Sequence, residues 1–318
     1  MKGLPVLAIL TLVLAPVRAR GWSAGASEAA ELDLPASALA AVAGPAASVL
    51  GRDASVVVDN PALLGRSAAA GVSASHAIRP LGFSDSQGSA FTSVAGVGAA
   101  GFQLRVVRGD LTAVTEDGSG AYGGPAGPVG YQAVVATLGA APSLEALTEG
   151  WPVRLRTGAA VTFVRRELAD SIAGGVGGSA GAVVEWPFGV SAWATARNLG
   201  LTNRTGWPAA FSFGAAWERN GLLLEDDRFS AALGGVLGRE PGVGGVLAVE
   251  YGLDAGPLGV AARAGWSPAT TTSASSWPAA GLVVRASSLA LEAGLAPMGD
   301  LGWVQVVSLS FQERPPGR

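Results

Sequence analysis

Cysteine and histidine, two residue types that often carry catalysis or bind metals, are almost absent from this chain. The 318 residues include no cysteine and one histidine, His76. Without cysteine there is no disulfide, no thiolate nucleophile and no cysteine metal site, and one histidine cannot form a histidine cluster for a metal. A Ser-His-Asp arrangement would have to use His76 itself, and a lone histidine is more often structural. We therefore expect no catalytic residue, no metal site, no cofactor and no enzymatic activity.

The charged residues inside the predicted strands are more informative. They fall on the small or polar face of each strand, and both signs occur there. In a barrel that face lines the interior, where opposite charges on neighbouring strands form ion pairs. We expect these pairs to hold a polar lumen together, with a substrate path as the alternative. The lumen-facing candidates are Arg105, Arg154, Arg156, Glu218, Glu250, Arg263, Arg285 and Glu292.

Other motifs point to structure and not to ligands. The glycine-rich run 174–178 is followed by no lysine and stands in no strand–loop–helix context, so it indicates a strand end or a bulge and not a phosphate loop. The acidic pairs around Glu116 and Glu225 lie in predicted connections. Charges there are typical of solvated loops.

The composition favours a membrane β-barrel. The chain has 47 glycines, 49% apolar residues and 14% charged residues, with a mean hydropathy of +0.39. No segment after the N-terminal region has the roughly 20 apolar residues that a membrane-spanning helix needs. High apolarity spread over many short strands is the pattern of an outer-membrane barrel.

The first residues indicate export. Lys2 precedes the apolar run 4–17, and Val17-Arg18-Ala19 resembles a cleavage site. We predict a signal peptide over 1–19, cleaved after Ala19, with cleavage after Ala26 as the alternative. The remaining chain would carry 19 basic and 24 acidic residues, without a basic patch dense enough for nucleic acid.

From residue 68 onward the apolar residues alternate with period two, as half-buried strands require. We therefore predict an all-β fold, a transmembrane antiparallel β-barrel of about 14 strands. A soluble sandwich or solenoid is the alternative. The predicted strands are 68–78, 89–96, 98–108, 130–139, 153–166, 176–186, 189–199, 209–218, 228–238, 243–252, 256–266, 278–286, 288–296 and 302–311.

The connections and the tryptophans agree with a barrel. Long, glycine- and serine-rich connections are predicted on the outer side at 109–129, 167–175, 200–208 and 267–277, and short turns on the periplasmic side. The predicted connections 140–152 and 219–227 are exceptions to this rule. Tryptophans are expected at strand ends, where the indole suits a membrane interface. They are Trp151, Trp186, Trp207, Trp217, Trp266, Trp277 and Trp303.

The residues before the strands divide the chain further. We predict an N-terminal hatch or plug over 20–66, the barrel over 67–311 and a tail over 312–318. Within the hatch, Asn60 suits a helix N-cap and Pro61 the first helical position. The residues singled out as the hatch motif are Asp53, Asp59, Asn60, Pro61 and Ala62.

These residues resemble a known family. Asp53-Ala54-Ser55 followed by Asn60-Pro61-Ala62 is similar to the opening motif of the PorV/PorQ family, within the wider FadL-like group of outer-membrane barrels. Leu63 stands where that family has glycine. Later matches follow in family order: Asn198-Leu199-Gly200, Glu250-Tyr251, Arg263-Ala264-Gly265-Trp266, and Gly299-Asp300-Leu301-Gly302 before Ser308-Leu309-Ser310-Phe311.

The resemblance implies a 14-stranded barrel in the bacterial outer membrane with an N-terminal hatch. FadL-like members carry hydrophobic compounds, whereas PorV-like members serve type IX secretion and bind exported cargo. We therefore expect a channel for small, hydrophobic compounds. The alternatives are a cargo-binding component of type IX secretion and a purely structural barrel. The expected partners are outer-membrane lipid, the barrel-assembly machinery, and a small hydrophobic substrate or secreted cargo proteins.

Overall fold

The computed structural model describes residues 32, 34–66, 68–116, 122–145, 148–168, 171–202, 207, 209–237, 243–266, 278–298 and 302–313. The predicted signal peptide, the first part of the predicted hatch, most of the predicted C-terminal tail, Trp277 and the residues 299–301 of the last motif lie outside them.

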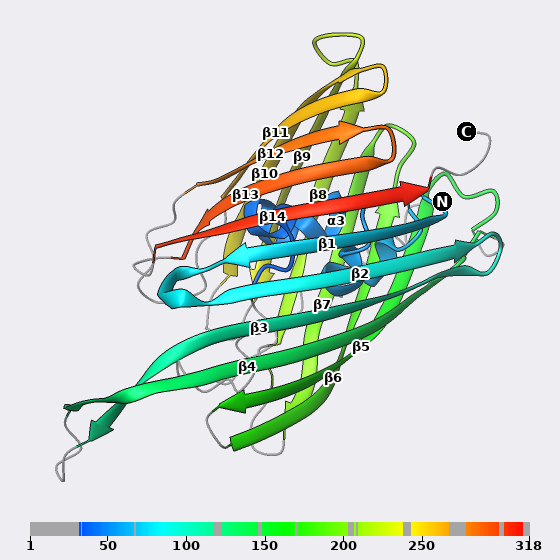
Figure 1. Cartoon of the computed structure of the whole chain (residues 1–318). Coiled ribbons are helices and arrows are strands. Elements are labelled where there is room, and N and C mark those ends of the chain that lie inside the picture. The colour runs from blue at the N-terminus through cyan, green and yellow to red at the C-terminus, as the bar shows by residue number, and fades with distance from the viewer. Residues whose placement is uncertain are drawn as a thin grey trace.

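The chain forms a closed antiparallel barrel of fourteen strands, as the alternation predicts (Figure 1). Each strand pairs with its sequence neighbours, and β1 closes the barrel against β14, with Ala70 opposite Glu313. The strands are β1 (Ala70–Ile78), β2 (Ser84–Val94), β3 (Gly98–Glu116), β4 (Tyr122–Pro142), β5 (Arg154–Leu168), β6 (Ser171–Glu185), β7 (Val190–Thr202), β8 (Ala210–Asn220), β9 (Asp227–Leu237), β10 (Val243–Ala255), β11 (Leu258–Trp266), β12 (Ala279–Ala286), β13 (Leu289–Pro297) and β14 (Trp303–Glu313).

The two faces of the wall differ in chemistry. Large apolar side chains such as Phe102, Leu104 and Phe163 are exposed on the outer face. Serine, threonine and glutamine alternate with them and are buried inside, where Ser75 and Ser308 bridge β1 and β14 at 2.8 Å. An outer surface this apolar needs a cover other than water.

The rim at which β1 begins and β14 ends is called the terminal rim here. Its six connections are 95–97, 143–153, 186–189, 221–226, 256–257 and 287–288. An even strand number brings both ends of the wall to this rim, and the turns are short, apart from 143–153. In bacterial barrels the short turns are on the periplasmic side.

The opposite rim departs from the sequence prediction. The expected loop 109–129 is mostly strand, because β3 and β4 run for 19 and 21 residues. β2 pairs with β3 only as far as Arg108, and β5 pairs with β4 only from Tyr131. Beyond these points β3 and β4 continue as a two-stranded ribbon (Figure 1). The expected loops 167–175 and 200–208 are likewise shortened by β5, β6 and β7. Backbone pairing within each hairpin outweighs the low strand propensity of these glycine-rich segments.

Residues 34–66, called the inner segment here, fold inside the barrel (Figure 1). The segment contains three short α-helices, α2 (Ala38–Ala43), α3 (Ala47–Leu50) and α4 (Val56–Asp59), and two 3-10 turns, η2 (Gly44–Ala46) and η3 (Pro61–Leu63). A further 3-10 turn, η4 (Pro80–Gly82), joins β1 to β2. No helix of the described residues is long and apolar enough to cross a membrane.

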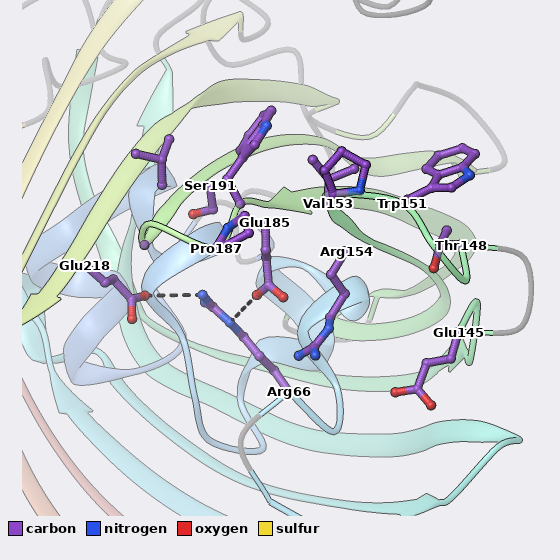
Figure 2. A pocket seen from close by; sticks show the side chains of 14 residues that line it. Arg66, Glu145, Thr148, Trp151, Val153, Arg154, Glu185, Pro187, Ser191 and Glu218 are labelled. Carbon is purple, nitrogen blue, oxygen red and sulfur yellow. Dashed lines mark hydrogen bonds and ion pairs between the residues drawn. The ribbon is translucent and has the colours of Figure 1, made fainter.

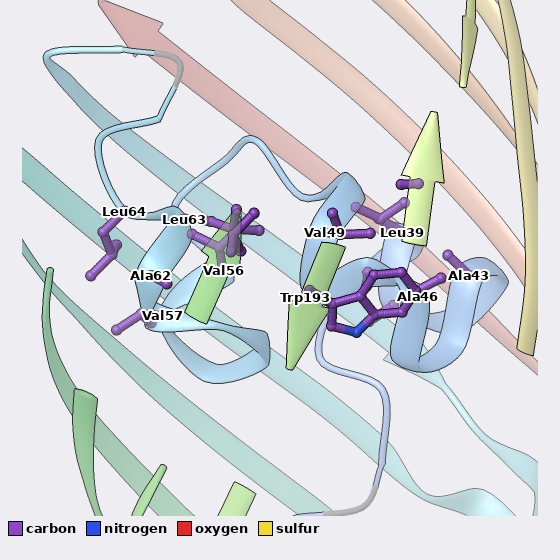
Figure 3. Packing of buried hydrophobic residues seen from close by; sticks show 14 of the residues in the cluster. Leu39, Ala43, Ala46, Val49, Val56, Val57, Ala62, Leu63, Leu64 and Trp193 are labelled. Atoms are coloured by element: carbon purple, nitrogen blue, oxygen red, sulfur yellow. The ribbon is translucent and has the colours of Figure 1, made fainter. Parts of the chain in front are cut away.

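The core of the molecule lies between the inner segment and the wall. Val49, Val56, Val57 and Leu63 are almost completely buried, and Trp193 of β7 packs in the same cluster (Figure 3). Because these residues are apolar on a segment surrounded by wall, their burial holds the segment in place. Burying each such side chain contributes about 1.5–3 kcal/mol.

Glycines of the wall make room for the backbone of the inner segment. A Cβ atom on Gly158 would lie 2.5 Å from Ala62 N, and one on Gly294 would lie 2.7 Å from Ala38 O. On Gly265 it would overlap the carbonyl oxygen of Val42. The glycines of this face therefore let main chain meet main chain.

The tryptophan prediction is wrong at one position. Trp207 is not at an exposed strand end but is 3% exposed, packed over Gly177 and Gly200. Trp266 and Trp303 are exposed at strand ends, as expected. The missing Cβ atoms of the two glycines create the space for the Trp207 ring, which the sequence pattern alone did not indicate.

Candidate functional site

The candidate site begins with the turn at Asn60, within the inner segment. Asn60 has an extended backbone, and its side-chain oxygen accepts a bond from Ala62 N at 3.1 Å, so it caps η3 with Pro61 in the first position as predicted. Its amide nitrogen also donates to Ser48 O at 2.7 Å. Asn60 is completely buried. The side chain therefore links α3 to η3 as well as capping a turn. Leu63 takes no left-handed backbone, so η3 needs no glycine there.

Two aspartates of the inner segment have altered acidity. Packing inside the barrel, followed by the charge of Glu292, raises the pKa of Asp53 to about 6, although Ser55 donates two hydrogen bonds to its carboxylate. Burial also raises the pKa of Asp59, and the nearby charge of Arg197, at 3.4 Å, opposes that shift. Desolvation disfavours the ionised form of both groups.

Arg66 fastens the end of the inner segment to the wall. Its Nε lies 2.8 Å from Glu185 Oε1 on β6, and its Nη2 lies 3.3 Å from Glu218 Oε1 on β8 (Figure 2). Arg66 also donates to Val49 O, and Arg52 forms a second ion pair with Glu218. These contacts are called the Arg66 latch here. It ties the inner segment to two strands far away in sequence.

A cavity of about 610 Å³ adjoins the latch at the terminal rim (Figure 2). Its walls are the 143–153 connection, the 186–189 turn and the adjoining strand ends. Trp151, Trp186 and two prolines supply apolar surface, while Arg66, Arg154 and three glutamates supply charge. The volume is that of a site for a small molecule.

A second charged cluster extends along the inner face of the wall from β9 to β13. Glu250 accepts from Arg228 at 2.5 Å and from Arg285 at 3.2 Å, and it pairs with Arg263. Arg263 also contacts Glu292 at 2.6 Å. All five groups lie inside the barrel. Two carboxylates thus compensate two of the three guanidinium charges in a partly buried site, which leaves a net charge of +1.

A third cluster holds the start of the inner segment. Asp85 of β2 pairs with Arg79 at 2.7 Å and accepts from Arg105 Nε at 2.9 Å. The two arginines also donate to main-chain carbonyls, Arg105 to Leu34 and Arg79 to Pro35. These arginines therefore bind the backbone of the inner segment, so the contacts do not depend on which side chains the segment carries at Leu34 and Pro35.

The structure places the predicted residues as follows. The five hatch-motif residues lie in the inner segment, where Asp59, Asn60, Pro61 and Ala62 are buried. Seven of the eight lumen candidates point inward and have ion-pair partners; they are Arg105, Arg156, Glu218, Glu250, Arg263, Arg285 and Glu292. Arg154 is exposed at the mouth of the cavity and has no ion pair among the described residues.

Sequence reasoning missed several members of these clusters. They are Arg52, Arg66, Arg79, Asp85, Arg197 and Arg228. Asp85 and Gln87 lie on the inner face of β2, in its first half, which the predicted strand 89–96 began too late to include. Arg52 and Arg66 stand in irregular segments, where no periodicity indicates a partner.

The later family motifs have structural roles in the wall. Asn198 has a left-handed backbone at φ 57°. It lies at a bulge in the pairing of β6 with β7, where the register changes between Gly178 and Ala180. The run 174–178 leads into this bulge, as predicted. Tyr251 donates its hydroxyl to Asp227 at 3.1 Å. Among the described residues no group of acidic or histidine side chains is suited to hold a metal ion.

No protein-family model matches the chain, and no curated protein sequence is similar to it. Solved structures do share the fold. The monoaromatic hydrocarbon channel TodX, as a deltaS2 mutant, is 11% identical with a TM-score of 0.56, covering 88% of this chain and 97% of that one. TodX solved as the toluene transporter of Pseudomonas putida has a TM-score of 0.51 at 10% identity, covering 92% and 96%.

The monoaromatic hydrocarbon channel CymD is 10% identical with a TM-score of 0.54, covering 89% of this chain and all of that one. CdiB from Acinetobacter baumannii is 13% identical at a TM-score of 0.44, and the match covers 76% of this chain and 60% of CdiB. The chain therefore has the barrel fold seen in TodX and CymD.

Proposed function

We propose that this chain is an outer-membrane β-barrel channel for small, predominantly apolar molecules, opened and closed by its inner segment. The observation that carries the proposal is the inner segment itself, folded within a closed barrel and fastened to the wall at its polar contacts. A structural barrel needs no such segment, because the backbone pairing of β1 with β14 already closes the ring.

Two further observations support a membrane location. The outer face exposes apolar side chains around the barrel, as a wall in contact with lipid does. Trp266 and Trp303 stand at strand ends, where indoles suit the interface. The predicted signal peptide would deliver the chain to the assembly machinery of the outer membrane.

The substrate class rests on the cavity and on the shared fold. Trp151 and Trp186 offer aromatic surface beside the Arg66 latch, and the barrels of similar fold are monoaromatic hydrocarbon channels. The cavity is of the size of a small-molecule site, and the two indoles would be the apolar contacts of an aromatic molecule beside its five charged side chains. Transport and not catalysis is therefore the activity that we propose.

The test is uptake across an outer membrane that itself resists apolar solutes. Cells producing the full chain, cells producing a chain without residues 34–64, and cells with neither are compared for entry of a labelled monoaromatic compound. We expect uptake with the full chain, and entry of small polar solutes as well once the segment is removed. The proposal fails if neither chain changes the entry of any solute. A purification of the full chain that instead brings down exported proteins would support the secretion alternative.

A further inference from the structure

The ring of Trp207 fills a slot in the inner face of the wall, near the rim opposite the terminal rim. The floor of this slot, called the Trp207 slot here, is a pair of glycines opposite each other on neighbouring strands, Gly177 of β6 and Gly200 of β7. A Cβ atom on Gly177 would lie 2.5 Å from Cζ3 of the indole, and one on Gly200 would lie 2.7 Å from its Cδ2. The indole therefore lies directly on bare backbone, and a side chain at either position would overlap it.

The sides of the slot are apolar. Val135 of β4 and Val164 of β5 pair with each other across the two strands and form one buried cluster with the indole. Leu32, the first described residue of the chain, packs against the same cluster. A flat floor between aliphatic side chains suits a planar aromatic ring.

The indole is an imperfect occupant of the slot. Trp207 is only 3% exposed, yet its Nε1 has no hydrogen-bond partner among the residues that the structure describes. A buried donor without an acceptor keeps the full cost of its desolvation. A hydrocarbon ring has no polar hydrogen, so it would occupy the same space without this cost.

The backbone of Trp207 is anchored beside the slot independently of the ring. Its N–H donates to Gly200 O at 3.1 Å, and its carbonyl oxygen accepts from Ala209 N at 2.8 Å. These bonds hold the main chain at the end of β7 while the side chain turns about χ1 and χ2. The ring can therefore leave the slot without a rearrangement of the strands.

We propose that the Trp207 slot is a binding site for a monoaromatic hydrocarbon, whose ring exchanges places with the indole of Trp207. The slot and the cavity beside the Arg66 latch lie at opposite rims of the barrel. A molecule that enters at the rim opposite the short turns therefore meets the slot first. The inference rests on the proposed channel function, and it specifies the substrate as a planar ring without hydrogen-bond donors.

Toluene binding to the purified full-length chain in detergent micelles tests the site. It is measured by headspace partition, with protein-free micelles as the blank. Trp207→Ala empties the slot, and the double variant Trp207→Ala/Gly200→Ala places a methyl group on its floor. Trp303→Ala is the matched control, because Trp303 is 45% exposed at the start of β14. Heat-dependent gel mobility shows that each barrel is folded.

We expect Trp207→Ala to bind toluene roughly tenfold more tightly than the natural chain, because the indole no longer competes. The double variant should lose this gain, and Trp303→Ala should bind as the natural chain does. A second measurement needs no substitution in the chain that is titrated. 5-Fluorotryptophan replaces all nine tryptophans, and the fluorine-19 resonance of residue 207 is identified by its loss in Trp207→Phe. Saturating toluene should shift this resonance and leave that of residue 303 in place.

Equal toluene affinity of the natural chain, Trp207→Ala and the double variant overturns the slot, and so does an unshifted 207 resonance at toluene saturation. Trp151→Ala distinguishes the two proposals. If this variant alone weakens binding, the cavity beside the Arg66 latch is the binding site, and the channel function stands without the slot. If neither the natural chain nor any variant binds toluene above the blank, the substrate class of the proposed function fails together with the slot.

Discussion

The side-chain oxygen of Asn60 fills the space that a Cβ atom on Gly181 would need. Gly181 lies in the lumen-facing register of β6, and Asn60 is the capping residue of the inner segment. The wall and the inner segment are therefore in close contact at this position, as they are at Gly158, Gly265 and Gly294. Four predictions follow from this fit and from the charges around it.

Alanine at position 181 should push the inner segment away from β6. The added methyl group overlaps Asn60, and the fully buried amide cannot move without losing its bonds to Ser48 and Ala62. We expect Gly181→Ala to leave the barrel assembled but to make trypsin cleave after Arg52 and Arg66 at a higher rate. Gly88→Ala is the matched control, because a Cβ atom there meets nothing within 4 Å. Equal cleavage of the two variants would contradict the close fit.

Asn60→Ala should loosen the same turn from the other side. The substitution removes the cap of η3 and leaves the carbonyl of Ser48 without its donor, which together cost about 2 kcal/mol. Increased conductance of small polar solutes through the barrel in a planar bilayer is the expected result. Asn60→Asp keeps the capping oxygen but loses the donor to Ser48, so its effect should be intermediate. If Asn60→Ala conducts as the natural chain does, Asn60 is a cap without influence on the passage.

Glu218→Gln should weaken the Arg66 latch without abolishing it. Arg52 loses its ion-pair partner, whereas Arg66 keeps Glu185 at 2.8 Å. Because these side chains are only partly buried, we expect an effect of about 1 kcal/mol, shrinking at high salt. The measurement is protease access to the inner segment at low and high salt. Glu225→Gln, an exposed carboxylate on the adjoining turn, should change nothing.

The architecture could be predicted from the sequence to a large extent because a barrel wall separates lipid-facing from lumen-facing residues at every second position. Phe102, Leu104 and Val106 alternating with Gln103 and Arg105 is such a pattern, and the strand count of fourteen is confirmed. The ends of β3 and β4 were not predicted, because their pairing depends on each other and not on an apolar face.

The contacts within the lumen could be predicted only in part. The inward charges on regular strands followed from alternation, as with Glu250 and Arg263. Arg66, by contrast, pairs with Glu185 and Glu218, which are more than a hundred residues away in the sequence. The residues around Arg66 form an irregular turn after Gly65, and they contain no pattern that indicates either partner. The cavity beside the latch arises from the same long-range arrangement, so the sequence contained no signal for it.

The hold of the wall on the inner segment should weaken as pH rises through the pKa of Asp53. That pKa is about 6 in the folded chain against an ordinary value of 3.8, so the docked state binds the proton more tightly than the undocked state. The stabilisation from protonated Asp53 is therefore complete below about pH 4 and is lost as pH rises through about 6. We therefore expect polar solutes to conduct better at about pH 7.5 than at about pH 5.

Asp53→Asn should reduce this dependence, because the amide is neutral throughout and stays beside Glu292 without repulsion. The dependence that remains would come from Asp59, whose pKa is also raised by burial. His76 lies on the outer face of β1 and contacts Ser86 there, so His76→Gln serves as a control substitution outside the lumen. A conductance that keeps its pH dependence in Asp53→Asn and loses it in His76→Gln would show that the controlling group is not in the inner segment.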